Sequence, residues 1–394
     1  MHLSTPIRLV FLCLLSTLAG ISQTASNSAV PVASSAGTEV THILRDLPPM
    51  SLEIYGIYDT YLGETDAGGT GHQVTLDSGG YQASRFGIRG YSQISSKPGA
   101  PRITYTLENG FMADTGALAD SSRIFNRQAW IGVAWKQGEV RFGRENSPLF
   151  EMLNKMDPYF GATYASYLNN VALYIPRYDN MVTYRSPSLK GWILQAHVSL
   201  GEGNTKTYSI DSLNTYIAAV EYYSPSGKLY VGSNYAQQNS ANRRFATRSG
   251  FTGGYYDAGW GKFYFGYFHG NTPTASASTN VYGPYYDLFS PSAIFPITSK
   301  LKLGGGCGWS HEETASQSNI REGSLIATYD FAKWGMVYST ANYMTNDNKA
   351  AFALGAAAPI TKNVPAAGHN VGGIQLGIRF MFSAQLLKPA SEKH

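Results

Sequence analysis

Charged residues are scarce in this chain of 394 residues, in which Asp, Glu, Lys and Arg together make up 14%. Ordinary soluble domains carry about 25%. The formal net charge is +4, and because no run of Lys or Arg accompanies it, we expect no nucleic-acid partner. Cysteine is nearly absent: Cys13 and Cys307 are too few for a disulfide framework or a structural zinc site. The eight histidines show no metal-ligand spacing, so we expect no metal and no cofactor.

Long apolar runs are also missing, with one exception at residues 9–21. This run follows Arg8 and is too short to span a bilayer, which favours a cleaved secretory signal over the alternative, a short membrane anchor. Small residues predict cleavage after Ala25, although positions up to Ala36 also fit. No later segment is apolar over about twenty residues, so we expect no transmembrane helix. An exported chain without one can still cross a membrane as a closed β-barrel.

What the sequence does contain favours strands. Glycine (42 residues) and tyrosine (28 residues) are abundant, a composition that suits strands and tight turns better than helices. From residue 51 onward apolar and polar residues alternate in segments of about ten residues, the length that a tilted barrel strand needs. These segments predict about sixteen strands, near 51–63, 83–93, 101–113, 127–136, 138–145, 178–186, 190–201, 214–224, 226–237, 247–257, 260–270, 281–290, 299–311, 322–331, 334–345 and 372–382.

The connections between these segments alternate in length. Long connections such as 64–82 and 146–177 are separated by brief turns such as 258–259 and 332–333. Outer-membrane barrels have short periplasmic turns and long external loops in this order, with both chain ends in the periplasm. The predicted organisation is a signal peptide over 1–25, a periplasmic extension over 26–50, a barrel over 51–382 and a periplasmic tail over 383–394.

The alternation also indicates which face of the strands is wet. In the last segment Ile374, Ile378 and Phe382 share one face, whereas Gln375 and Arg379 share the other. A basic residue that faces lipid at mid-bilayer costs about 2–4 kcal/mol, so the charged phase has to face a hydrated lumen. A soluble β-sandwich would have its apolar faces inward instead, and alternation alone leaves that alternative open.

Five stretches of the chain are similar to one known family. SLEIYGIYDTYLG (51–63), SRFGIRG (84–90), YTLENGFMADTGAL (105–118), FNRQAWIGV (125–133) and VRFGRENSPL (140–149) resemble the general porins of β-proteobacteria. The resemblance implies a homotrimer of sixteen-stranded antiparallel barrels in outer-membrane lipid, each narrowed by an inward-folded third external loop at about 146–177. It also implies that Phe382 is the insertion signal for the barrel-assembly machinery. The chain departs from the family where residues follow that aromatic, and at Thr183, where many relatives have a basic lumen residue.

Clusters of charge at a constriction allow such a pore to choose between cations and anions. We expect the lumen wall and the constriction to be lined by Arg85, Arg89, Glu108, Arg127, Arg141, Glu151, Asp157 and Arg379. Arg127 is assigned by the resemblance alone, since simple alternation places it with Ala129 and Ile131 and so near the rim. The alternative for the two loop acids, Glu151 and Asp157, is that they solvate the loop or pair with Lys155. Arg177 is a further base at the end of this loop.

The inward charges have a basic excess of two, from Arg85, Arg89, Arg141, Lys302 and Arg379 against Glu108, Glu221 and Asp330. The sequence therefore predicts an outer-membrane channel for passive diffusion of small hydrophilic solutes and ions, with a weak preference for anions. The alternatives are a channel for one solute class, such as a sugar or an organic anion, and a barrel that serves as an enzyme or adhesin. His197 and Ser199 share a strand face, but a polar lumen explains them without catalysis, and we expect no enzyme. The tyrosines are interpreted as interface girdles and loop packing, with an aromatic track inside the pore as the alternative.

Overall fold

The computed structural model of the protein describes residues 49–172, 174–201, 214–239, 246–271, 285–312, 318–357 and 362–387. The predicted signal peptide, nearly all of the predicted extension and residues 388–394 of the predicted tail lie outside these ranges and stay predictions. Among the described residues, no helix is long and apolar enough to cross a membrane.

The described residues form seventeen strands in one sheet. The strands are β1 Met50–Ala67, β2 Gly71–Ser78, β3 Arg85–Gln93, β4 Arg102–Gly110, β5 Gln128–Trp135, β6 Gly138–Asn146, β7 Arg177–Arg185, β8 Trp192–Ser199, β9 Thr215–Tyr223, β10 Leu229–Asn239, β11 Ala246–Asp257, β12 Lys262–Asn271, β13 Tyr285–Pro296, β14 Leu301–Glu312, β15 Ile320–Ala332, β16 Gly335–Asn346 and β17 Val371–Leu387.

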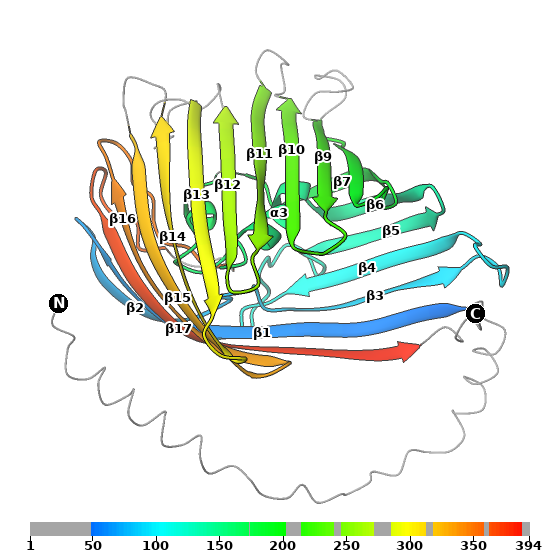
Figure 1. The fold of residues 1–394 in the computed structure, drawn as a ribbon, viewed down its shortest axis with the longest axis horizontal. Coiled ribbons are helices and arrows are strands. Elements are labelled where there is room, and N and C mark those ends of the chain that lie inside the picture. Colours follow the sequence, from blue (N-terminus) through cyan, green and yellow to red (C-terminus); the bar gives the residue numbers. More distant parts are fainter. Residues whose placement is uncertain are drawn as a thin grey trace, which may run out of the picture. The chain divides into compact units, whose positions relative to one another are not determined.

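The sheet closes on itself through its first and last strands. β1 pairs antiparallel with β17 from Leu52 opposite Leu387 to Ala67 opposite Val371, and the two strands lie side by side in Figure 1. β1 also pairs with β3 over residues 50–57 and with β2 over residues 60–67. β2 and β3 therefore share one position around the barrel, so that the seventeen strands fill sixteen positions. This confirms the predicted sixteen-stranded antiparallel barrel, in which closure removes the exposed sheet edges.

The two faces of the sheet have opposite chemistry. Large apolar side chains such as Phe142, Leu194 and Leu325 are exposed, the last of them by 66%. Polar side chains at alternate positions, including Gln195 and Glu221, are buried inside the barrel. A soluble sandwich buries its apolar faces, whereas a barrel in lipid exposes them and keeps its lumen polar. The observed arrangement excludes the sandwich.

One predicted connection contains a strand. The segment 64–82 includes the end of β1 and the whole of β2, which pairs back onto β1 after a turn at residues 68–70. The sequence GHQVTLDS is mostly polar, and this composition concealed its alternation. Val74 and Leu76 nevertheless share the outward phase and are exposed.

A second boundary was wrong beside a proline. The predicted strand stopped at residue 290, directly before Pro291; proline lacks a backbone N–H and usually ends a strand or marks an irregularity. β13 instead continues to Pro296. Its register with β14 passes over Ser290 and Pro291 and resumes with Ser292 opposite Gly306, so the proline sits at a local gap in the ladder.

The last strand also continues beyond Phe382, where the tail was predicted to begin. Residues up to Leu387 pair with the start of β1, and Gln385 Nε2 donates to Ser51 Oγ (2.9 Å) and to the Leu52 carbonyl (3.1 Å).

This pairing predicts different outcomes for two truncations. Ending the chain at Leu387 should leave the thermal midpoint of the detergent-folded barrel unchanged. Ending it at Phe382 should lower the midpoint by several degrees, because several ladder bonds of about 0.5–1.5 kcal/mol each are lost. Thermal melts of the two truncated proteins check this, and equal midpoints would contradict the pairing of residues 383–387.

Candidate pore constriction

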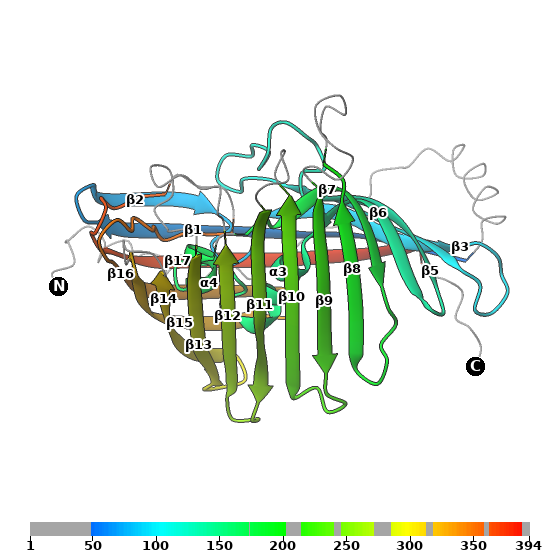
Figure 2. The same ribbon diagram turned by 90° about the horizontal axis from the view of Figure 1, so that it is seen from above.

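The connection between β6 and β7, residues 147–176, is called loop 3 below. It contains two helices, α3 Pro148–Met156 and α4 Tyr167–Val171. Ser147 caps α3 by accepting from the Phe150 N–H (3.2 Å), and proline in the first turn is a typical helix start. Figures 1 and 2 show α3 on the concave side of the sheet. The predicted third loop therefore contacts the inner face of the barrel.

Loop 3 packs on a part of the wall that combines glycines with buried aromatic side chains such as Phe251 and Phe268. The buried face of α3 includes Met152 and Met156 and contacts β10, β11 and β12. A Cβ atom on Gly232 would lie 2.7 Å from Met156 Cε, and one on Gly308 would lie 2.1 Å from the Tyr167 ring. Both distances are inside van der Waals contact. Met156 Cε is the end of a flexible side chain and can shift, whereas a side chain at position 308 would have to displace the buried Tyr167 ring.

Polar contacts fasten the second half of loop 3 to the last strands. The Tyr164 N–H donates to Gln375 Oε1 (2.8 Å), and Asn342 Nδ2 donates to the Tyr164 carbonyl (2.7 Å). Asn170 Nδ2 donates to Glu322 Oε2 (3.1 Å). These groups are buried, and each lost partner would leave an unsatisfied group at a cost of about 1–3 kcal/mol. Loop 3 is therefore held against β10–β17 and leaves the side of β3–β7 open.

The two acids of loop 3 differ in position. Asp157 is buried (5% exposed); it accepts from the Tyr159 N–H (2.9 Å) and from the Ser166 hydroxyl, and so ties the turn between the helices together. Burial raises the pKa of Asp157 to about 7. Glu151 is half-buried and lines the lumen on the side of Arg141. Neither acid pairs with Lys155, whose ammonium contacts Glu221.

Between loop 3 and the open wall lies a cavity of about 240 Å³, which we call the arginine cavity. The cavity is lined by Arg85 of β3, by Arg177 of β7 and by Arg127, which precedes β5. Loop-3 residues such as Phe150 complete the lining. Arg127 Nε donates to Glu108 Oε1 at 2.7 Å, and both side chains are buried. Three guanidinium groups thus meet one carboxylate.

The other two arginines of this cavity carry unused donors. Arg85 Nε and Arg177 Nε are buried without a hydrogen-bond partner in the described part of the chain. The Arg177 guanidinium also lies 4.8 Å from the centre of the Phe150 ring. Buried donors without partners are uncommon in proteins, and among the described residues no ion pair with a carboxylate offsets the positive charge that these two guanidinium groups add beside the cavity.

The remaining predicted arginines have partners of their own in the lumen. Arg89 Nε donates to Glu53 Oε2 (2.8 Å), and its side chain is 55% exposed. Arg141 lies between Glu139 (2.6 Å) and Glu145 (3.5 Å). Arg379 Nη1 donates to Gln82 Oε1 (2.9 Å). The structure therefore brings Arg85, Arg127 and Arg177 together around the arginine cavity. A neighbouring lumen cavity of about 990 Å³ is lined by Arg85 and Glu108 together with Arg89, Arg141 and Glu151.

Strand alternation does not predict the direction of the Arg127 side chain, because Arg127 lies outside the strand. β5 begins at Gln128, so Arg127 precedes the strand and its side chain is not bound to the outward phase of Ile131. It is only 5% exposed. Residues that the sequence interpretation missed include Glu53, the partner of Arg89, and Lys262. Alternation in GKFYFGYF would have placed Lys262 and Tyr264 on one face, opposite Phe263 and Phe265.

A closed barrel with an apolar outer face, a polar lumen and a loop packed inside it defines a membrane channel protein of the porin class. The sequence matches the family model described as Gram-negative porin over residues 17–349. The chain belongs to this family, whose members are outer-membrane channels and not enzymes.

Individual relatives are more distant. The chain is 28% identical over 219 residues to an outer membrane porin protein of Bordetella pertussis; the match covers 49% of this chain and 56% of that protein, so it spans about half of that relative's length. Its structure is similar to an anion-selective porin from Comamonas acidovorans (TM-score 0.70, 22% identity, 84% of this chain and 100% of that chain). It is also similar to the trimer form of OmpT of Vibrio cholerae (TM-score 0.60, 16% identity, 85% and 100%). At these identities the structural likenesses show a shared fold.

Proposed function

We propose that this protein is a channel through which small hydrophilic solutes and ions diffuse across the outer membrane, with a weak preference for anions. The observation that carries the preference is the arginine cavity, in which Arg85, Arg127 and Arg177 meet a single partner carboxylate, Glu108. Charges in a narrow aqueous pore act on ions within about a Debye length, ~10 Å at 0.1 M salt.

Partners elsewhere in the lumen keep the preference weak. Arg89 and Arg141 are neutralised by neighbouring carboxylates, so most of the excess charge comes from the arginine cavity. The anion-selective porin from Comamonas acidovorans has the same fold, which supports the direction of the preference.

The test is the reversal potential of the unmodified channel across a bilayer with a KCl gradient. We expect a small potential of the sign that chloride selectivity gives. It should fade as the salt approaches 1 M, where the Debye length is about 3 Å. Strong cation selectivity would contradict the preference. A protein that inserts but conducts no ions would favour the alternative of a barrel enzyme or adhesin.

We further propose that three copies assemble in the membrane and that Phe382 is read by the barrel-assembly machinery. Phe382 is exposed by 46% on the outer face of β17, where another protein can reach it, and a trimer form exists for the structurally similar OmpT. The mass of the protein in mild detergent should be that of three copies, and a stable monomer would count against assembly. Phe382→Ala should lower the amount in the outer membrane but not refolding in detergent; equal membrane levels would contradict the signal.

A further inference from the structure

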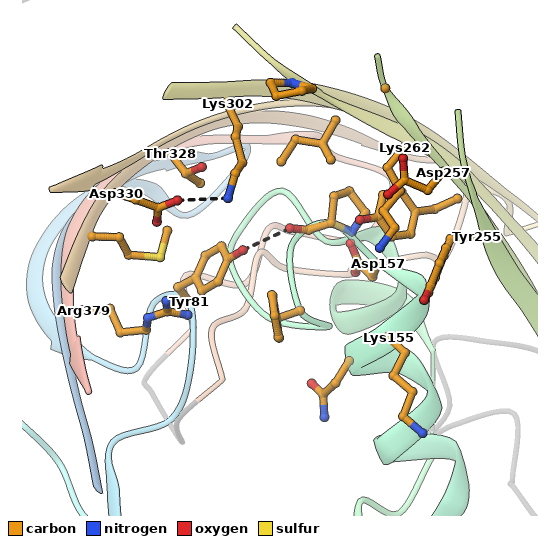
Figure 3. A pocket seen from close by; sticks show the side chains of 18 of the residues that line it. Tyr81, Lys155, Asp157, Tyr255, Asp257, Lys262, Lys302, Thr328, Asp330 and Arg379 are labelled. Carbon is orange, nitrogen blue, oxygen red and sulfur yellow. Dashed lines mark hydrogen bonds and ion pairs between the residues drawn. The ribbon is translucent and has the colours of Figure 1, made fainter. Parts of the chain in front are cut away.

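Another lumen cavity, of about 620 Å³, borders the arginine cavity and shares Tyr81, Asn154 and Phe160 with it. Loop 3 forms one side of it, with Lys155 and Asp157, and residues of β11 to β17 form the other (Figure 3). Asp257 and Lys262 flank the turn at residues 258–261. Because short turns lie on the periplasmic side of such barrels, a solute that has passed loop 3 reaches this cavity before it leaves the pore. We call it the inner vestibule site.

Four cations line the inner vestibule site, and three of them have partners. Lys155 contacts Glu221, Lys302 Nζ donates to Asp330 Oδ2 (2.9 Å), and Arg379 Nη1 donates to Gln82 Oε1 (2.9 Å). Lys155 and Lys302 are each offset by a carboxylate, whereas Arg379 keeps its charge because Gln82 is neutral.

Lys262 differs from the two paired lysines. In the described ranges it forms no ion pair, and its ammonium lies over the Tyr255 ring, 3.6 Å from the ring centre. Tyr255 is in turn held by the stacked ring of Tyr230, with ring centres 5.6 Å apart. Asp257 is the nearby acid that contributes a Coulombic attraction. A cation fixed by aromatic rings and lacking a bound carboxylate is a ready anchor for an anionic group.

The wall beside Lys262 is apolar. Tyr264 and Ile294 line the same cavity. Ile294 lies opposite Lys262 in the β12–β13 ladder, and Tyr264 lies opposite Tyr255 in the β11–β12 ladder. An inorganic anion would interact only with the charge of Lys262. The apolar wall of the site would then contribute nothing to the binding free energy. Ligand sites typically combine an apolar lining with a few placed polar groups, in volumes of about 300–1,000 Å³.

We infer that the inner vestibule site binds small organic anions that carry an apolar ring, such as aromatic carboxylates. The carboxylate contacts Lys262, and the ring lies against Tyr264 and Ile294. The inference rests on the channel function proposed above and adds to it a solute class and a second binding site, next to the arginine cavity.

The experiment uses single-channel recordings with benzoate added on the side of the short turns. Benzoate should block the chloride current at millimolar concentration, whereas acetate (charge without a ring) and benzyl alcohol (ring without charge) should block far less. Lys262→Gln should raise the half-blocking concentration of benzoate about tenfold, the change expected for one charge-assisted contact. Ile294→Ser should weaken benzoate block and leave acetate unaffected. Lys300→Gln, which removes an exposed lysine of the turn at residues 297–300, is the matched control and should change nothing.

Each outcome bears on the inference. Equal block by benzyl alcohol and benzoate, or block by a neutral sugar such as maltose, would overturn the anionic part. Equal block by acetate would overturn the apolar part, and an unchanged half-blocking concentration in Lys262→Gln would overturn the site. A conducting channel that ignores benzoate overturns this inference alone, whereas a protein that conducts no ions overturns the channel function as well. The conductance of each variant shows whether it has folded into a channel. Ile294→Ser tests the same site without changing Lys262, so the site can still be tested if Lys262→Gln fails to fold.

Discussion

Replacing Arg85 by glutamate together with Arg177 by glutamine should reverse the ion preference of the channel. In the native protein three arginines and Glu108 give the arginine cavity a net charge of +2; in the variant, Arg127 alone would stand against two carboxylates. The interaction energy of two unit charges 4 Å apart is about 1 kcal/mol in bulk water and about 4 kcal/mol at the effective dielectric constant near a protein surface. The reversal potential in a KCl gradient should therefore change sign.

The control for this variant changes the total charge by the same amount elsewhere. Arg89→Glu with Lys300→Gln alters two exposed residues, one paired with Glu53 and one on a turn. Its reversal potential should move by a small fraction of the shift in the cavity variant, and that fraction should vanish first as salt is raised. Equal shifts in the two variants would mean that overall lumen charge, rather than the arginine cavity, sets the preference.

Replacing Gly308 by leucine should displace loop 3 and lower the conductance. The new side chain would occupy the place of the Tyr167 ring, which a Cβ atom alone would approach to 2.1 Å. Overpacking of this kind costs about 1–3 kcal/mol, comparable to the hydrogen bond from the Tyr167 hydroxyl to the Ile320 carbonyl (3.2 Å). Because loop 3 lies between this wall and the arginine cavity, α4 can only move toward the open part of the lumen. Single-channel conductance in 1 M KCl should fall and fluctuate more.

Gly323→Leu is the control for that variant. Gly323 lies on the neighbouring strand, β15, and a Cβ atom there meets nothing within 4 Å. Its conductance should equal that of the unmodified protein. Unchanged conductance in Gly308→Leu would show that loop 3 is not held by the glycine-lined wall.

The sequence predicted the barrel because lipid imposes a local rule. Every second residue of a strand must be apolar, and every long connection must lie on one side. Arg85, Arg379 and Ile378 therefore take the positions that alternation assigned to them, and about sixteen strands could be placed within a few residues. The strand prediction was wrong where the alternation of apolar and polar residues is hard to see. β2 was missed because polar residues dominate it, and the end of β13 was missed because a gap in the ladder at Pro291 lets the strand continue.

The constriction was decided by the tertiary structure. Arg127 lies before its strand, and no periodicity sets its direction; its place depends on Glu108 in the neighbouring strand. Asp157 could be assigned to the pore or to the loop on sequence alone, and only the fold of loop 3 brings Ser166 and the Tyr159 N–H to its carboxylate. Strand phase is a property of adjacent residues, which a sequence shows directly. The charge that faces a solute depends on which distant side chains neutralise it, and those contacts exist only once the barrel has closed and loop 3 has packed inside it.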